Sequence, residues 1–257
     1  MKKKNYDKYN EEEIINLKEG GAILHRILRD LEKEFVPGIK TIEIDVMAEK
    51  AILAAGCVPV FKNYKPVGAK YPFPASSCIS INEEVAHGLP GERVIKEGDI
   101  VSLDIGLRYK GLVVDSAISF GVGAITEREQ KLIDVTRVAC DIGIAQIKSG
   151  VYINEIGKAI EKYVKKEGFN VVAILCGHAV GREVHSDPYI PHIDMGEKGE
   201  RLEEGMVLAI EPHISTGNGR ISLSKKDDWT YLSDDKGKTA QFEHTVLVTK
   251  DGFEVLT

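Results

Sequence analysis

Apolar residues near the start of the chain recur every three or four positions and predict two helices. The first opens at Asn10, which with Glu13 can form a capping box, and it is stopped by Pro37 and Gly38. The second continues the same spacing as far as Gly56. In the second helix the apolar residues alternate with charged ones.

A hairpin is predicted in the middle of the chain, where residues 100–107 and 112–120 read as strands around the short segment 108–111. A turn at 109–110 would put Asp104 directly opposite Asp115. A turn at 110–111 would make the two acids diagonal neighbours on the same face. Like charges this close destabilise a sheet, so a positive group should compensate in either register.

The second half of the chain repeats the pattern of the first. Thr126 and Glu129 can form another capping box, and the amphipathic segment that follows stops at Ser149 and Gly150. The segment EGDIVSLD at 97–104 matches EGMVLAIE at 204–211, and each copy ends in a carboxylate. We therefore expect a single α+β domain over 1–257 that contains two related halves.

These halves would cover about 10–125 and 126–257, after an N-terminal extension at 1–9. Each should pack two outer helices on mainly antiparallel inner strands, with a site between the halves.

A divalent metal is the simplest group to compensate the acids. The residues around Asp104 and Asp115 are apolar or glycine, and no basic partner lies near them in sequence. Glu211 and Glu243 occur at the equivalent places in the second half. Four carboxylates entering apolar strands favour a cation site over solvated surface acids.

Histidines supply the other expected ligands and donors. His178 and His185 lie in the segment GHAVGREVH, whose small residues permit close backbone approach, and His87 lies in NEEVAHGLP. His213 shares strand parity with Glu211 and can approach the site. His192 is expected to be an ordinary surface or packing residue.

Composition and charge narrow the functional class. The net charge of −6 argues mildly against binding a phosphate backbone, and the longest apolar run is far shorter than the roughly 20 residues of a membrane span. The start of the chain has no apolar stretch of signal-peptide type, and the four cysteines show no framework spacing. We expect a cytoplasmic protein, monomeric by default, with no membrane or nucleic-acid partner.

The motifs together resemble methionine aminopeptidases of the short bacterial type, which have the pita-bread fold. The resemblance covers nearly the whole chain and keeps all five metal-ligand positions. It is carried by NEEVAHGLP, LDIG at Asp104, DSA at Asp115, GHAVGREVH, AIEP at Glu211 and QFEHT at Glu243.

The resemblance implies an enzyme that removes the initiator methionine from nascent polypeptides. Asp115 and Glu243 would bridge two divalent metals, Asp104 would complete one, and His178 with Glu211 would complete the other. Glu211 would also carry a proton. Cobalt, manganese, iron and zinc all tolerate such a donor set. Ribosome association is compatible with the activity, although no segment encodes it visibly.

Substrate contacts also follow from the resemblance. His87 and His185 would bind the scissile amide and its oxyanion. The methionine pocket would be formed by Tyr64, Phe73, Cys78 and Trp229. The sequence departs from the family at 65–72, where the run is longer than in the family. The Pro and Gly content of this run predicts a defined turn. The turn can alter which substrate residues beyond the methionine the enzyme accepts.

Two other functions fit parts of the pattern. An Xaa-Pro peptidase of the same fold would use the same ligands, but those relatives usually carry an additional N-terminal domain, for which this chain has no room. A non-catalytic binding module of this fold would typically have lost metal ligands, whereas all five positions are present here.

Overall fold

The computed structural model describes residues 6–257 and has the α+β character expected from the sequence. Residues 1–5 of the predicted N-terminal extension lie outside the described residues. The helices are α1 (Glu11–Glu32), α2 (Thr41–Ala54), α3 (Glu127–Ile144) and α4 (Asn154–Lys166). The strands are β1 (Val58–Pro59), β2 (Cys78–Ile81), β3 (Glu84–Ala86), β4 (Ile100–Tyr109), β5 (Leu112–Gly121), β6 (Asn170–Val171), β7 (Cys176–Ala179), β8 (Ser186–Pro191), β9 (Val207–Ile210), β10 (His213–Ser215), β11 (Ile221–Leu223), β12 (Tyr231–Ser233), β13 (Thr239–Gln241), β14 (His244–Val248) and β15 (Phe253–Val255).

Both predicted capping boxes are confirmed. The Glu13 amide donates to Asn10 Oδ1 and the Asn10 amide donates to Glu13 Oε2, each at 2.9 Å. Thr126 and Glu129 exchange the same pair of bonds at 2.7 and 3.3 Å. Each box satisfies two amides that a helix N-terminus otherwise leaves without partners, which fixes where α1 and α3 begin.

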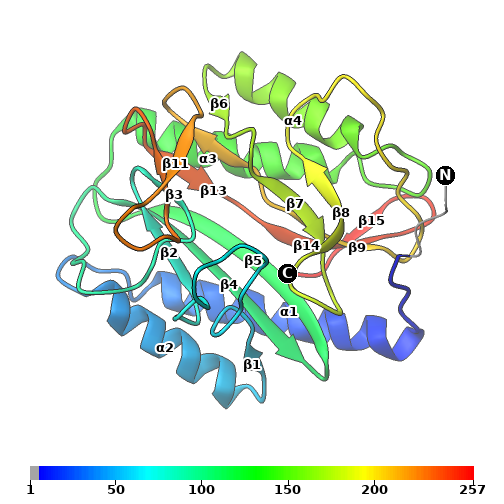
Figure 1. The fold of residues 1–257 in the computed structure, drawn as a ribbon, viewed down its shortest axis with the longest axis horizontal. Coiled ribbons are helices and arrows are strands. Elements are labelled where there is room, and N and C mark those ends of the chain that lie inside the picture. Colours follow the sequence, from blue (N-terminus) through cyan, green and yellow to red (C-terminus); the bar gives the residue numbers. More distant parts are fainter. Residues whose placement is uncertain (1–5) are drawn as a thin grey trace.

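The strands form four small sheets in which all the pairs between described strands are antiparallel. One sheet joins β1 and β2 to one edge of β4, and β5 to its other edge. A second has the order β15-β14-β9-β7-β8, and the two three-stranded sheets are β13-β10-β6 and β11-β12-β3. The strands lie between α1 with α2 on one side and α3 with α4 on the other (Figure 1).

The β4–β5 hairpin settles the choice between the two predicted registers. Tyr109 pairs with Leu112, so the turn is Lys110–Gly111, and both turn residues take positive φ (45° and 87°), as a type I′ turn requires. Asp115 therefore faces Gly106, and the two acids of the hairpin are diagonal neighbours. A Cβ at Gly106 would lie 3.3 Å from Asp115 Oδ1 and even closer to Val60 and Phe61, which explains why glycine stands there.

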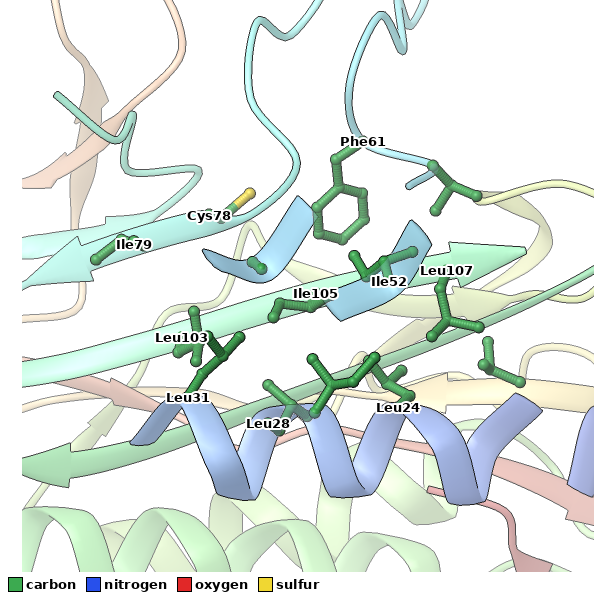
Figure 2. Packing of buried hydrophobic residues seen from close by; sticks show 14 of the residues in the cluster. Leu24, Leu28, Leu31, Ile52, Phe61, Cys78, Ile79, Leu103, Ile105 and Leu107 are labelled. Carbon is green, nitrogen blue, oxygen red and sulfur yellow. The ribbon is translucent and has the colours of Figure 1, made fainter. Parts of the chain in front are cut away.

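One face of this hairpin forms the core beneath α1. Leucines of the helix pack against alternate residues of β4 (Figure 2). The packed residues are Leu24, Leu28 and Leu31 of α1 with Leu103, Ile105 and Leu107 of β4. Full burial of each such side chain contributes roughly 1.5–3 kcal/mol. Because side chains alternate along a strand, Asp104 and Asp115 are directed to the opposite face, away from α1.

Candidate active site

A single cavity of about 70 Å³ brings together all the residues that the sequence predicts for the site. It is lined by the five predicted metal ligands, the two donor histidines and the four pocket residues. These are Asp104, Asp115, His178, Glu211, Glu243, His87, His185, Tyr64, Phe73, Cys78 and Trp229. Phe61 and Pro66 complete the lining.

Two of the acids are aligned by contacts between segments far apart in the chain. The Glu243 amide donates to the Ala117 carbonyl at 2.9 Å, and the Ala117 amide donates back at 3.4 Å. The Thr245 hydroxyl accepts from the Asp115 amide at 2.9 Å and donates to the Asp115 carbonyl at 2.7 Å. These buried bonds hold the Asp115 and Glu243 backbones side by side.

The opposite wall comes from the five-stranded sheet. His178 on β7 pairs with Ala209 on β9, and Glu211 follows directly after β9. His178 Nε2 therefore lies 3.3 Å from Glu211 Oε1. Ligand atoms of Asp115, His178 and Glu243 all lie within 4.8 Å of one another.

The donor set fits a divalent cation. Asp104 Oδ1 and Glu243 Oε1 are buried, and neither has a hydrogen-bond partner. Burying carboxylate oxygens without partners is costly, and oxygen atoms with one imidazole are suitable ligands for several divalent metals. The buried oxygens therefore lack a positive partner that a bound cation would supply.

The electrostatics of the carboxylates lead to the same conclusion. Burial, together with the negative charge of neighbouring acids, raises the pKa of Asp104 and of Glu243 well above the ordinary range. Burial likewise raises the pKa of Asp115 to about 7, although His178 opposes the change. For Glu211, burial is outweighed by the hydrogen bond and charge of His178, which bring its pKa down to about 2. Glu211 is therefore an ionised acceptor at neutral pH.

The two predicted donor histidines are neutral. Burial lowers the pKa of His87 to about 4, and burial with the charge of His178 lowers that of His185 to about 3. The Tyr64 hydroxyl lies 2.8 Å from His185 Nδ1, which orients the ring. His87 itself has φ of 55°, an uncommon conformation for a residue other than glycine that is often found at functional sites.

Aromatic residues form the apolar end of the cavity. The Phe73 and Trp229 rings meet edge to face with centroids 5.1 Å apart. Cys78 on β2 pairs with Asp104 in register, so its thiol borders the acids, and burial raises its pKa well above the usual value. The thiol is therefore neutral and acts as a small apolar group.

Two neighbours of the site make contacts that the sequence did not indicate. Of the two roles expected for His192, surface or packing, the structure shows packing: the residue is fully buried, and its Nε2 accepts from the Glu211 amide at 3.4 Å, directly behind a predicted ligand. Its place in the sequence, directly after Pro191 at the end of β8, carried no signal of this contact. Gly177 allows the β9 backbone to approach closely, since a Cβ at this position would lie 2.2 Å from the Ala209 carbonyl oxygen. This is a different purpose from the expected close approach to a ligand.

Gln241 was not singled out from the sequence, although it shares strand parity with Glu243. Its Nε2 donates to Asp104 Oδ2 at 3.5 Å. His213, which was expected near the site, is buried two residues after Glu211.

Comparisons with known proteins identify the family of this chain. The sequence model of metallopeptidase family M24 matches residues 16–250. The chain is 42% identical to methionine aminopeptidase 1 of Bacillus subtilis over 241 residues, which is 94% of each chain. It is 39% identical to the methionine aminopeptidase of Aquifex aeolicus over 252 residues, 97% of each.

The solved structures agree. The methionine aminopeptidase from Rickettsia prowazekii superposes with a TM-score of 0.94 at 34% identity, covering 98% of this chain and 100% of that one. A prolidase from Pyrococcus furiosus reaches a TM-score of 0.76 at 23% identity, covering 97% of this chain and 65% of that one, which shows a shared fold alone. This chain therefore belongs to metallopeptidase family M24, has its pita-bread fold and groups with the methionine aminopeptidases.

Proposed function

We propose that the cavity is the active site of a metal-dependent aminopeptidase that removes N-terminal methionine, and that it holds two divalent ions. Asp115 and Glu243 would contact both ions, Asp104 would complete one, and His178 with Glu211 would complete the other. The observation that carries this proposal is the pair of buried, unpartnered oxygens Asp104 Oδ1 and Glu243 Oε1. Cobalt, manganese, iron and zinc all suit four carboxylates and one imidazole.

Such a pair of bound ions supplies an activated water and stabilises negative charge that develops on the substrate. Glu211 is the residue of this chain that takes the proton. Its carboxylate is ionised at neutral pH because His178 stabilises the charge, so its oxygens carry no proton and can transfer one from the water to the leaving amine.

His87 and His185 bind the scissile amide. Both rings are neutral at physiological pH and can donate a hydrogen bond without a full charge. When the Tyr64 hydroxyl donates to His185 Nδ1, the ring proton lies on Nε2, which leaves a fixed donor for the substrate. Donors that are oriented in advance stabilise a developing oxyanion most effectively.

The apolar end selects the side chain. Phe73, Cys78 and Trp229 offer polarizable contacts and a neutral thiol, which suit a thioether that makes almost no hydrogen bonds. Tyr64 borders the same space. A free substrate amine close to the acids would restrict cleavage to the terminal residue.

The substrates are the N-termini of nascent polypeptides. We place the enzyme in the cytoplasm as a monomer, because its four cysteines are all unpaired and 257 residues suffice to bury a core without a partner. No helix within residues 6–257 is both long and apolar enough to cross a membrane. Ribosome association would fit this role.

The test is release of methionine from Met-Ala-Ser by protein stripped with a chelator and then restored with manganese, cobalt, iron or zinc. Activity should be absent after stripping and should return with metal. Titration to one and two equivalents per chain reports how many ions turnover needs. Undiminished cleavage by the stripped protein would contradict the proposal.

A further inference from the structure

A second hollow, of about 370 Å³, lies beside the catalytic cavity, and we refer to it as the outer groove. Its sides are Val67 and Ala69 of the 65–72 loop, facing Leu223 at the end of β11 and Tyr231 on β12. Val67 is completely exposed and Leu223 is 45% exposed, so the groove presents unoccupied apolar surface.

The outer groove is continuous with the active site. Pro66, His87 and Trp229 line both the catalytic cavity and the groove. Trp229 is only 8% exposed and borders both spaces. A chain that leaves the cavity past His87 therefore enters the groove.

The 65–72 loop is held firmly enough to act as a wall. Its base is closed by the Phe73 amide donating to the Tyr64 carbonyl at 2.8 Å. Its tip turns through Gly68, whose φ of 92° suits glycine, and the Ala69 amide donates to the Pro66 carbonyl at 3.1 Å. The predicted defined turn is therefore confirmed.

Two contacts fix the loop to the segment before Trp229. Lys70 Nζ lies 2.7 Å from Asp228 Oδ1, and the Tyr71 hydroxyl donates to the Asp227 carbonyl. The Tyr71 ring also meets Trp229 at 6.3 Å. A wall fixed before the substrate arrives loses less entropy on binding than a mobile loop would.

We propose that the outer groove is a substrate subsite that binds apolar side chains downstream of the scissile bond. The inference rests on the proposed function and adds a second specificity element to it. Because the groove adjoins the cavity and an extended chain advances only about 3.3–3.6 Å per residue, residues a few positions downstream of the scissile bond would lie over the groove. Lys70 and Asp228 neutralise each other at its edge, which leaves the apolar walls to decide the preference.

The test compares kcat/KM for Met-Ala-Ser-Leu-Leu-amide, Met-Ala-Ser-Asp-Asp-amide and the tripeptide Met-Ala-Ser, using metal-restored enzyme. The wild type should prefer the leucine peptide over the aspartate peptide about tenfold, an effect equivalent to burying part of a Leu side chain. Val67→Asp should reduce this ratio to about one. Val67→Lys should reverse it, because the lysine attracts the acidic peptide.

Val36→Asp is the matched control, since Val36 is also an exposed valine but lies outside the groove. It should keep the tenfold ratio. The subsite would be overturned if the wild type cleaved the two long peptides at equal rates. It would also be overturned if Val67→Asp and Val67→Lys left the ratio of the two rates unchanged. In either case, cleavage of Met-Ala-Ser would leave the proposed function intact. Failure to cut Met-Ala-Ser would instead overturn the proposed function, and the subsite with it.

Discussion

Ala117 and Glu243 exchange two backbone hydrogen bonds although they belong to opposite halves of the chain. This bridge sets Glu243 beside the strand that carries Asp115, and the Thr245 hydroxyl holds the Asp115 backbone from the same side. The catalytic cavity therefore depends on contacts between distant segments. Metal affinity and folding should be coupled, because residues proposed to hold the metal also meet across this contact.

Asp115→Ala and His87→Ala should separate metal binding from turnover. Asp115→Ala should abolish both, since that carboxylate is proposed to contact both ions. His87→Ala should keep the metal and lower kcat/KM about 10²–10³-fold, the usual effect of removing one oxyanion donor. Metal content by elemental analysis, with peptide kinetics, checks both variants. Equal loss of metal in the two variants would contradict this division of roles.

Tyr64→Phe tests the orientation of His185. The variant removes the hydroxyl that lies 2.8 Å from His185 Nδ1 and keeps the ring that borders the cavity. We expect kcat to fall about tenfold, because a lost hydrogen bond of this kind costs about 1 kcal/mol or somewhat more. KM and metal content should change little. A fall in metal content equal to the fall in kcat would argue against a role through His185.

Trp229→Ala should weaken selection of the terminal residue. The ring forms the apolar end of the cavity with Phe73, so its loss should reduce the ratio of kcat/KM for a Met peptide over a Leu peptide several-fold. Metal content should stay at the wild-type value. Phe253→Ala, at an exposed aromatic that does not line the cavity, is the control. Unchanged selectivity would remove Trp229 from the pocket.

Metal affinity should weaken as the pH falls through about 7. Burial raises the pKa of Asp115 to about 7 in the metal-free protein, and a proton competes with the metal for the same carboxylate. Metal affinity falls toward acid pH because only the ionised carboxylate binds metal, and the ionised fraction decreases below that pKa. We expect at least about tenfold weaker manganese binding at pH 6 than at pH 8, measured by calorimetric titration, because the raised pKa values of Asp104 and Glu243 act in the same direction. A carboxylate with an ordinary pKa would show almost no change in this interval.

Local signals in the sequence were sufficient to predict where α1 and α3 begin. Asn10 with Glu13 fixes the start of α1 through neighbouring atoms, so the pattern carries the information. The hairpin register was harder, because segment 108–111 allows two turns. Positive φ at both Lys110 and Gly111 decided it, and only the backbone conformation reveals that choice.

Contacts between distant strands could not be read from the pattern. His192 lies behind Glu211 because β8 and β9 both pair with β7, a relation that no local spacing encodes. Gly177 is required by the approach of the β9 backbone at Ala209, which becomes visible only when the strands are placed together. That the two halves are related repeats stays a proposal built on the repeated motifs.

The most direct test of the central claim is a competition between Met-Ala-Ser and an Xaa-Pro peptide, using protein stripped of metal and then restored. We predict that methionine release returns with metal and that the Xaa-Pro peptide stays intact. Cleavage of the Xaa-Pro peptide alone would leave the fold and the ligands in place and contradict the pocket assignment. Cleavage of neither peptide would contradict the assignment of the cavity as an aminopeptidase site.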